Sequence, residues 1–168
     1  ISLHKIDMGV DIILFDAEDQ GLNGGKETDW CLGSQHWARN LHRSPYQPKF
    51  GILLDMAGSK DAIFTKDETS MTHAPRVMNK VWKIAQGRGY GNFFVDQASG
   101  PLIDDHKFVN EIANIPMIDI INRPQTPTRF GSYWHTHDDN MNIIDKKTLR
   151  AVGQTVLAVI YKEAAGVF

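Results

Sequence analysis

Two groups of acidic and histidine side chains, near opposite ends of the chain, have the residue types needed for metal-assisted chemistry. Residues 16–19 read Asp-Ala-Glu-Asp, and residues 134–140 read Trp-His-Thr-His-Asp-Asp-Asn. Two neighbouring acids with a distant histidine can supply two zinc ligands and a general base. One carboxylate neutralises the cation while its neighbour stays free to move a proton. The pattern favours a metal-dependent hydrolase or transferase.

Each group also has an ordinary structural interpretation. Acids are common after strands, so residues 16–19 could form a solvated loop. A single histidine is more often structural than a ligand. Trp134 before His135 and the acids that follow favour a functional role, because acids beside a ligating histidine often orient its second ring nitrogen. His137 is the competing ligand, although its place two residues further on indicates a different direction.

A third polar group, at residues 104–106, reads Asp-Asp-His. In one interpretation Asp104 caps a helix, at an end where the helix dipole favours acids. In the other, the start of the helix displays an active-site carboxylate. The residues alone leave both open.

The elements that must position these side chains alternate along the sequence. A nearly continuous apolar run at residues 10–15 predicts a strand buried on both faces. Further strands are predicted at residues 50–56, 92–95 and 116–121. Helices are predicted at residues 33–41, 73–86, 104–113 and onward from a cap at Asp145. The alternation argues for a layered α/β fold with a largely parallel sheet, in which ligands bind beyond the carboxyl ends of the strands.

Composition and charge exclude several classes of protein. The 168 residues are enough for one domain, with 42% hydrophobic and 23% charged residues. A net charge of −2 gives no general attraction to nucleic acid. The single cysteine, Cys31, excludes an intrachain disulfide and a multi-cysteine zinc site. No apolar run approaches the roughly 18 residues needed to span a membrane.

With these motifs in this order, the chain resembles the zinc-dependent glutaminyl cyclases of the animal type and their bacterial relatives, which belong with the M28 zinc aminopeptidases. The resemblance runs across nearly all of the chain and rests on residues 15–19, 53–55, 104–106 and 134–140. It implies an α/β three-layer sandwich with a central mixed, mostly parallel sheet. It also implies that residues 1–168 are a single catalytic domain without its N-terminal part.

The resemblance implies a role for each polar residue. Glu18 matches the residue that serves as general base and acid. Asp104 and Asp55 match an acidic pair in the hydrogen-bond network of the cyclases. Asp19 and His135 match zinc ligands, although the animal enzymes carry Glu at the position of Asp19.

Two aromatic residues and a segment outside the chain complete the implied site. Trp134 matches the aromatic wall beside the substrate, and Trp30 is matched to a further pocket aromatic. The family's zinc site needs one more Asp, expected from a segment upstream of Ile1. The chain opens there without Met or a signal-peptide pattern, so we expect a processed product or a fragment.

The implied function is that of a glutaminyl-peptide cyclotransferase, secreted or periplasmic, which converts the N-terminal glutamine of peptides and proteins to pyroglutamate with zinc and releases ammonia. A two-zinc aminopeptidase of the same fold is the alternative, with Asp55 as a ligand to the second zinc. A non-catalytic domain that keeps the fold is the third possibility.

Overall fold

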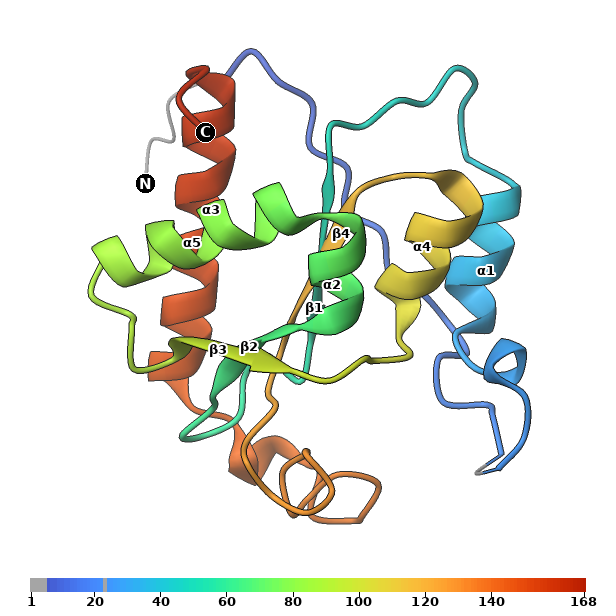
Figure 1. Ribbon diagram of the computed structural model, residues 1–168, viewed down its shortest axis with the longest axis vertical. Coiled ribbons are helices and arrows are strands. Elements are labelled where there is room, and N and C mark those ends of the chain that lie inside the picture. Colours follow the sequence, from blue (N-terminus) through green and yellow to red (C-terminus); the bar gives the residue numbers. More distant parts are fainter. Residues whose placement is uncertain (1–5, 23) are drawn as a thin grey trace.

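The computed structural model describes residues 6–22 and 24–168, in which helices and strands alternate (Figure 1). The elements, with η for a 3-10 helix, are η1 (Glu27–Asp29), α1 (Leu32–Arg39), β1 (Gly51–Asp55), β2 (Phe64–Asp67), α2 (Glu68–His73), α3 (Pro75–Gly87), β3 (Phe94–Ser99), α4 (Asp105–Ala113), β4 (Met117–Ile121), η2 (Met141–Ile143) and α5 (Lys146–Ala164).

The parallel pair of β1 and β4 forms the centre of the fold, with Asp55 opposite Ile121 at its carboxyl end. Successive side chains of a strand point to opposite faces. Ile118 and Ile120 therefore pack in one core with α3 and α5, whereas Met117 packs in a second core with Val109 of α4. The strands thus lie between α3 and α5 on one side and α1 and α4 on the other (Figure 1). The predicted α/β class with parallel strands is confirmed.

A second parallel pair, β2 and β3, leads the chain toward α4. An isolated antiparallel bridge between Phe64 and Asn122 links this pair to the end of β4. The sequence analysis missed β2, and it placed β3 two residues too early. The helix predicted at residues 73–86 is confirmed as α3, which begins two residues later at Pro75, whose ring suits the first position of a helix, whereas α2 was not predicted.

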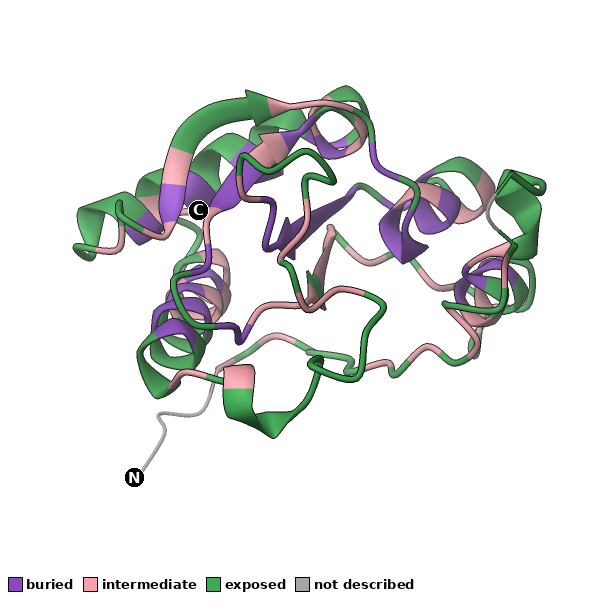
Figure 2. Cartoon of the chain, turned by 90° about the horizontal axis from the view of Figure 1, so that it is seen from below, coloured by how far each residue is buried: buried purple, intermediate pink, exposed green. Residues whose placement is uncertain are grey.

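The strand predicted at residues 10–15 is wrong. This segment forms no strand with any described residue, and Val10, Ile12 and Leu14 are 48%, 86% and 91% exposed. Only alternate side chains turn inward, among them Phe15, whose ring lies 5.7 Å from that of Trp37. Figure 2 shows how buried residues gather instead on β4 and the inner faces of the helices. An apolar run alone does not specify a pairing partner.

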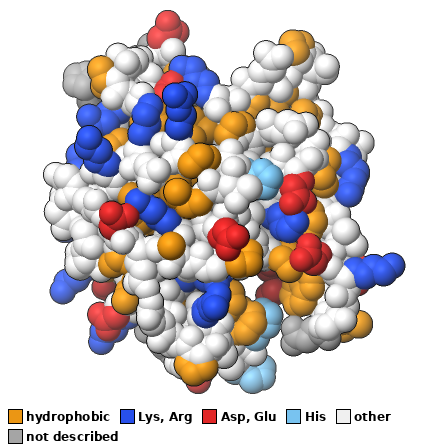
Figure 3. Space-filling model, viewed as in Figure 1, with side chains coloured by type: hydrophobic (Ala, Val, Ile, Leu, Met, Phe, Trp, Pro, Cys, Tyr) orange, Lys and Arg blue, Asp and Glu red, His pale blue; other side chains and the backbone are white. Residues whose placement is uncertain are grey.

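Basic, acidic and apolar side chains all occur across the face shown in Figure 3, so no single sign of charge covers it. Among the described residues, no helix has the length and apolar character required to cross a bilayer.

The start of α1 holds the segment that carries Glu18 and Asp19. The backbone N–H groups of Cys31, Leu32 and Gly33 donate to the carbonyl oxygens of residues 18, 17 and 16, at 2.8, 3.0 and 2.9 Å. The first N–H groups of a helix have no partner inside the helix, so they are free to bind this segment. A Cβ atom at position 33 would lie 2.2 Å from the carbonyl oxygen of Asp16, so only glycine permits this approach.

We therefore expect Gly33→Ala to destabilise the fold by about 1–3 kcal/mol, because the added methyl group must push residues 16–19 away from α1. Gly153→Ala is the matched control, since a Cβ there meets nothing within 4 Å. That change in exposed helix should stabilise the protein by about 0.5–1 kcal/mol. Urea unfolding measures both changes. Equal effects of the two substitutions would contradict the close approach at Gly33.

Candidate active site

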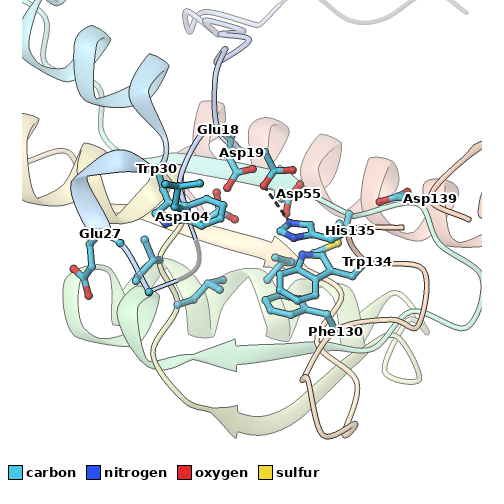
Figure 4. A pocket seen from close by; sticks show the side chains of 17 residues that line it. Glu18, Asp19, Glu27, Trp30, Asp55, Asp104, Phe130, Trp134, His135 and Asp139 are labelled. Carbon is cyan, nitrogen blue, oxygen red and sulfur yellow. Dashed lines mark hydrogen bonds and ion pairs between the residues drawn. The ribbon is translucent and has the colours of Figure 1, made fainter. Parts of the chain in front are cut away.

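Every residue predicted for the site lines one cavity of about 450 Å³ (Figure 4). Residues 18–22 and 24–30 form one wall, and the end of β1 and the start of α4 form another. The loop between residues 130 and 139 closes the third side. The predicted residues in this lining are Glu18, Asp19, Trp30, Asp55, Asp104, Trp134 and His135. The cavity brings these residues together, while their individual roles stay predictions.

The side chains of the two predicted metal ligands are in direct contact at the cavity. Nε2 of His135 lies 3.2 Å from Oδ1 of Asp19 (Figure 4). Two oxygen or nitrogen ligands of one tetrahedral zinc ion lie about 3.3 Å apart, because each sits about 2.0–2.1 Å from the metal. The pair therefore fits two corners of a zinc site. His137, the competing ligand, is not among the residues that line the cavity.

Aromatic rings fix the orientation of the His135 side chain. The ring of Trp134 stacks on the imidazole of His135, with centroids 4.0 Å apart. The ring of Trp30 is stacked with the same imidazole at a centroid distance of 6.4 Å. Phe130 in turn stacks on Trp134 at 4.4 Å. Stacked rings restrict rotation of the imidazole and give the cavity an apolar wall. His135 also has a positive φ of 57°, so the loop backbone itself is bent to present it.

The acidic residues of the cavity are held close together in a partly dry environment. Burial, a hydrogen bond with Asp19 and the charges of Asp19 and Asp55 raise the pKa of Glu18 to about 8. Burial raises the pKa of Asp55 to about 6, with the charge of Asp105 adding to it and the hydrogen bond from the Met56 N–H opposing it. A carboxyl group whose pKa lies near neutrality can both accept and return a proton. Glu18 has this property.

Asp104 is both a helix cap and a cavity residue, so the two interpretations of its sequence are compatible. Its Oδ1 accepts from the Asp105 N–H at 2.6 Å, at the start of α4. It also lines the cavity, and its carboxylate lies near that of Glu18, because ligand atoms of Glu18, Cys31 and Asp104 are within 4.8 Å of one another. Burial and the charge of Asp55 raise the pKa of Asp104 well above its usual value.

The sequence analysis missed Cys31 and Phe130. Sγ of Cys31 lies 3.8 Å from Oε1 of Glu18, and burial raises the pKa of this thiol, so it stays protonated and donates to the carboxylate. Phe130 lines the cavity and stacks on Trp134. The sequence held only two signals for these residues. Cys31 follows Trp30, and Phe130 is an aromatic residue four positions before Trp134.

Comparison with known proteins supports the same family across the chain. Residues 2–160 match peptidase family M28. A glutaminyl-peptide cyclotransferase of Drosophila melanogaster is 27% identical over 165 residues, which are 87% of this chain and 44% of that protein.

Solved structures agree. A glutaminyl cyclase of Porphyromonas gingivalis is 45% identical, with a TM-score of 0.92 over 96% of this chain and 59% of the other. A Zn-dependent exopeptidase of Parabacteroides distasonis is 49% identical, with a TM-score of 0.84 over 88% of this chain and 52% of the other. The chain thus spans about half the length of these relatives. From the match over residues 2–160, the chain belongs to peptidase family M28.

Proposed function

We propose that the protein is a zinc-dependent glutaminyl-peptide cyclotransferase, which closes the N-terminal glutamine of peptides into pyroglutamate and releases ammonia. The observation that carries this proposal is the arrangement in one cavity of a proton-transfer carboxyl, Glu18, a ligand pair, Asp19 and His135, and an aromatic wall at Trp134. Relatives described as glutaminyl cyclases support it.

In the proposed reaction, the α-amine of the substrate attacks the γ-carbonyl carbon, the new C–N bond closes the ring, and the bond to the amide nitrogen breaks. Asp19 and His135 would hold zinc, which supplies Lewis-acid polarisation of a carbonyl group. Glu18 takes the proton that the attacking amine loses and returns it to the departing nitrogen, which leaves as ammonia. Its raised pKa suits both transfers.

The neighbouring residues position the substrate. Trp134 lines the cavity with the rings of Phe130 and His135 packed against it, and its free edge offers an apolar contact for the methylene groups of glutamine and helps to exclude water. Asp104 lies beside Glu18 and can hydrogen-bond the nitrogen at the reacting carbon.

A two-zinc aminopeptidase is the second candidate. Asp55 lines the same cavity, and its charge acts on Glu18, so it could hold a second metal ion beside the first. The similarity to a protein described as a Zn-dependent exopeptidase favours this candidate as well. In that reaction Glu18 would activate a water molecule rather than an amine.

The role of Glu18 is tested in the whole protein by Glu18→Gln, which keeps the size of the side chain but cannot transfer a proton. We expect kcat to fall by about 100- to 10,000-fold while zinc content and melting temperature stay unchanged. Glu27→Gln is the control, because Glu27 lies on the same cavity but points away from the acids (Figure 4). A Glu18→Gln protein that turns over at the normal rate would refute the proton-transfer role.

Substitution of the metal ligands should change the zinc content, unlike substitution of Glu18. We expect Asp19→Ala and His135→Ala to lower the zinc content as well as the rate, because each removes one of the two ligands that this chain provides. Elemental analysis of the dialysed proteins measures the loss. Full zinc content in both variants would place the catalytic metal elsewhere.

Cyclase and peptidase are separated by their products. With a Gln-initiated peptide, we expect a loss of about 17 Da, the mass of the ammonia expelled after proton transfer to the leaving nitrogen, and we expect a Leu-initiated peptide to remain intact. Mass spectrometry of both incubations reports the outcome. Release of free leucine without ammonia loss would instead support the aminopeptidase, with Asp55 as a metal ligand.

A further inference from the structure

A second polar cluster lies behind the cavity, where α4 meets β4. Its members are Asp104, His106 and Asp119, which are 4%, 0% and 0% exposed. Asp104 and His106 stand at the start of α4, and Asp119 stands in the middle of β4. His106 and Asp119 have no part in the reaction proposed above, so the cluster needs a separate explanation.

The hydrogen bonds of His106 leave one ring nitrogen free. Nε2 lies 3.3 Å from Oδ1 of Asp67, which also accepts from the Ser70 N–H at 2.8 Å. An ionised carboxylate only accepts, so Nε2 carries the hydrogen and Nδ1 presents a lone pair. That atom lies 3.9 Å from Oδ2 of Asp119, beyond hydrogen-bonding distance.

The atoms around this lone pair have few partners. Nδ1 of His106 has no hydrogen-bond partner among the described residues, and the carboxyl group of Asp119 has none beyond the side chain of Asp104. Ligand atoms of Asp104, His106 and Asp119 all lie within 4.8 Å of one another. Buried polar atoms normally have partners, and three acceptors that face one another repel unless something positive lies between them.

The excess of buried carboxyl groups also favours a positive ion in this cluster. Four carboxyl groups are buried in this region, at positions 67, 104, 105 and 119, and Arg123 is the only Lys or Arg side chain that is buried in the described chain. Removing an unbalanced carboxylate from water costs several kcal/mol. Burial and mutual repulsion raise the pKa values of Asp104 and Asp119 well above their usual value. A proton shared by the two carboxyls, or ordered water, is the competing way to fill the space.

We propose that Asp104, His106 and Asp119 bind a divalent first-row transition metal ion, at a site separate from that of Asp19 and His135. One imidazole nitrogen and two carboxylates form a mixed nitrogen and oxygen donor set, which suits zinc, manganese or cobalt better than calcium or magnesium. The carboxylate of Asp67 on the far nitrogen of His106 orients the ring, as carboxylates commonly do for ligating histidines. The ion links the start of α4 to β4 and holds Asp104 from behind.

The test uses the whole protein with His135→Ala, which removes a ligand of the catalytic site and leaves the second site intact. The probe is Co²⁺, followed by equilibrium dialysis and by its visible absorption spectrum. We expect about one cobalt ion per chain in this variant, and none after Asp119→Asn is added, because the amide is a much poorer ligand than the carboxylate. Absence of cobalt from the His135→Ala protein would overturn the proposal whatever the further variants do.

A second pair of variants separates ligation from folding. His106→Gln in the His135→Ala background should lose the cobalt, whereas His36→Gln, at an exposed position on α1, should keep it. Cobalt should also raise the melting temperature of the His135→Ala protein, and it should have no such effect once Asp119→Asn is present. Cobalt that remains bound after Asp119→Asn and also after His106→Gln would show that the metal binds elsewhere and would overturn the proposal. Neither result decides the catalytic proposal, because that proposal is tested separately by substitutions at Glu18, Asp19 and His135.

Discussion

The site depends on the contact between the N-terminus of α1 and residues 16–18. These residues belong to no helix or strand, so this contact anchors the backbone that carries Glu18 and Asp19, and the contact of Asp19 with His135 adds a second link. Free N–H groups of α1 hold their carbonyl oxygens, and the missing side chain of Gly33 lets the two backbones meet. The same turn brings Cys31 to Glu18, so one contact sets both the position and the environment of the proton-transfer residue.

The rest of the site is fixed by the parallel pairing of β1 with β4. Because the carboxyl ends of parallel strands lie at the same edge, Asp55 and the start of the loop that carries His135 emerge side by side. The cap at Asp104 then brings a further acid to this edge. The resulting concentration of carboxyl groups costs stability, which proteins commonly accept at functional sites. A bound cation would offset part of this cost.

The sequence predicted those parts of the fold in which local pattern and tertiary structure agree. The strands around Leu53 and Ile118 and the cap at Asp104 were recognisable because apolar runs and a capping acid have local causes. The prediction of a strand at residues 10–15 was wrong, since pairing depends on a partner that the run does not encode. The short β2 escaped detection, because Phe-Thr-Lys-Asp has no apolar run.

For the site, the order of the motifs was enough to collect the residues of the cavity, but not their contacts. The approach of Cys31 to Glu18 and the stack of Trp134 on His135 both involve a loop residue with positive φ, Cys31 in the first and His135 in the second. Non-glycine residues rarely adopt this conformation, so no sequence pattern predicts it. The unpartnered nitrogen of His106 beside Asp119 likewise becomes visible only when α4 is seen against β4.

The central claim is that an amine of the substrate, and not water, attacks the carbonyl carbon. Reaction of a Gln-initiated peptide in water enriched in ¹⁸O tests it most directly. Our account predicts a pyroglutamyl product that contains no ¹⁸O, because ring closure takes no oxygen from the solvent. Incorporation of ¹⁸O into a carboxylate of the product would show hydrolysis of the side-chain amide or of the peptide bond, and would contradict the account.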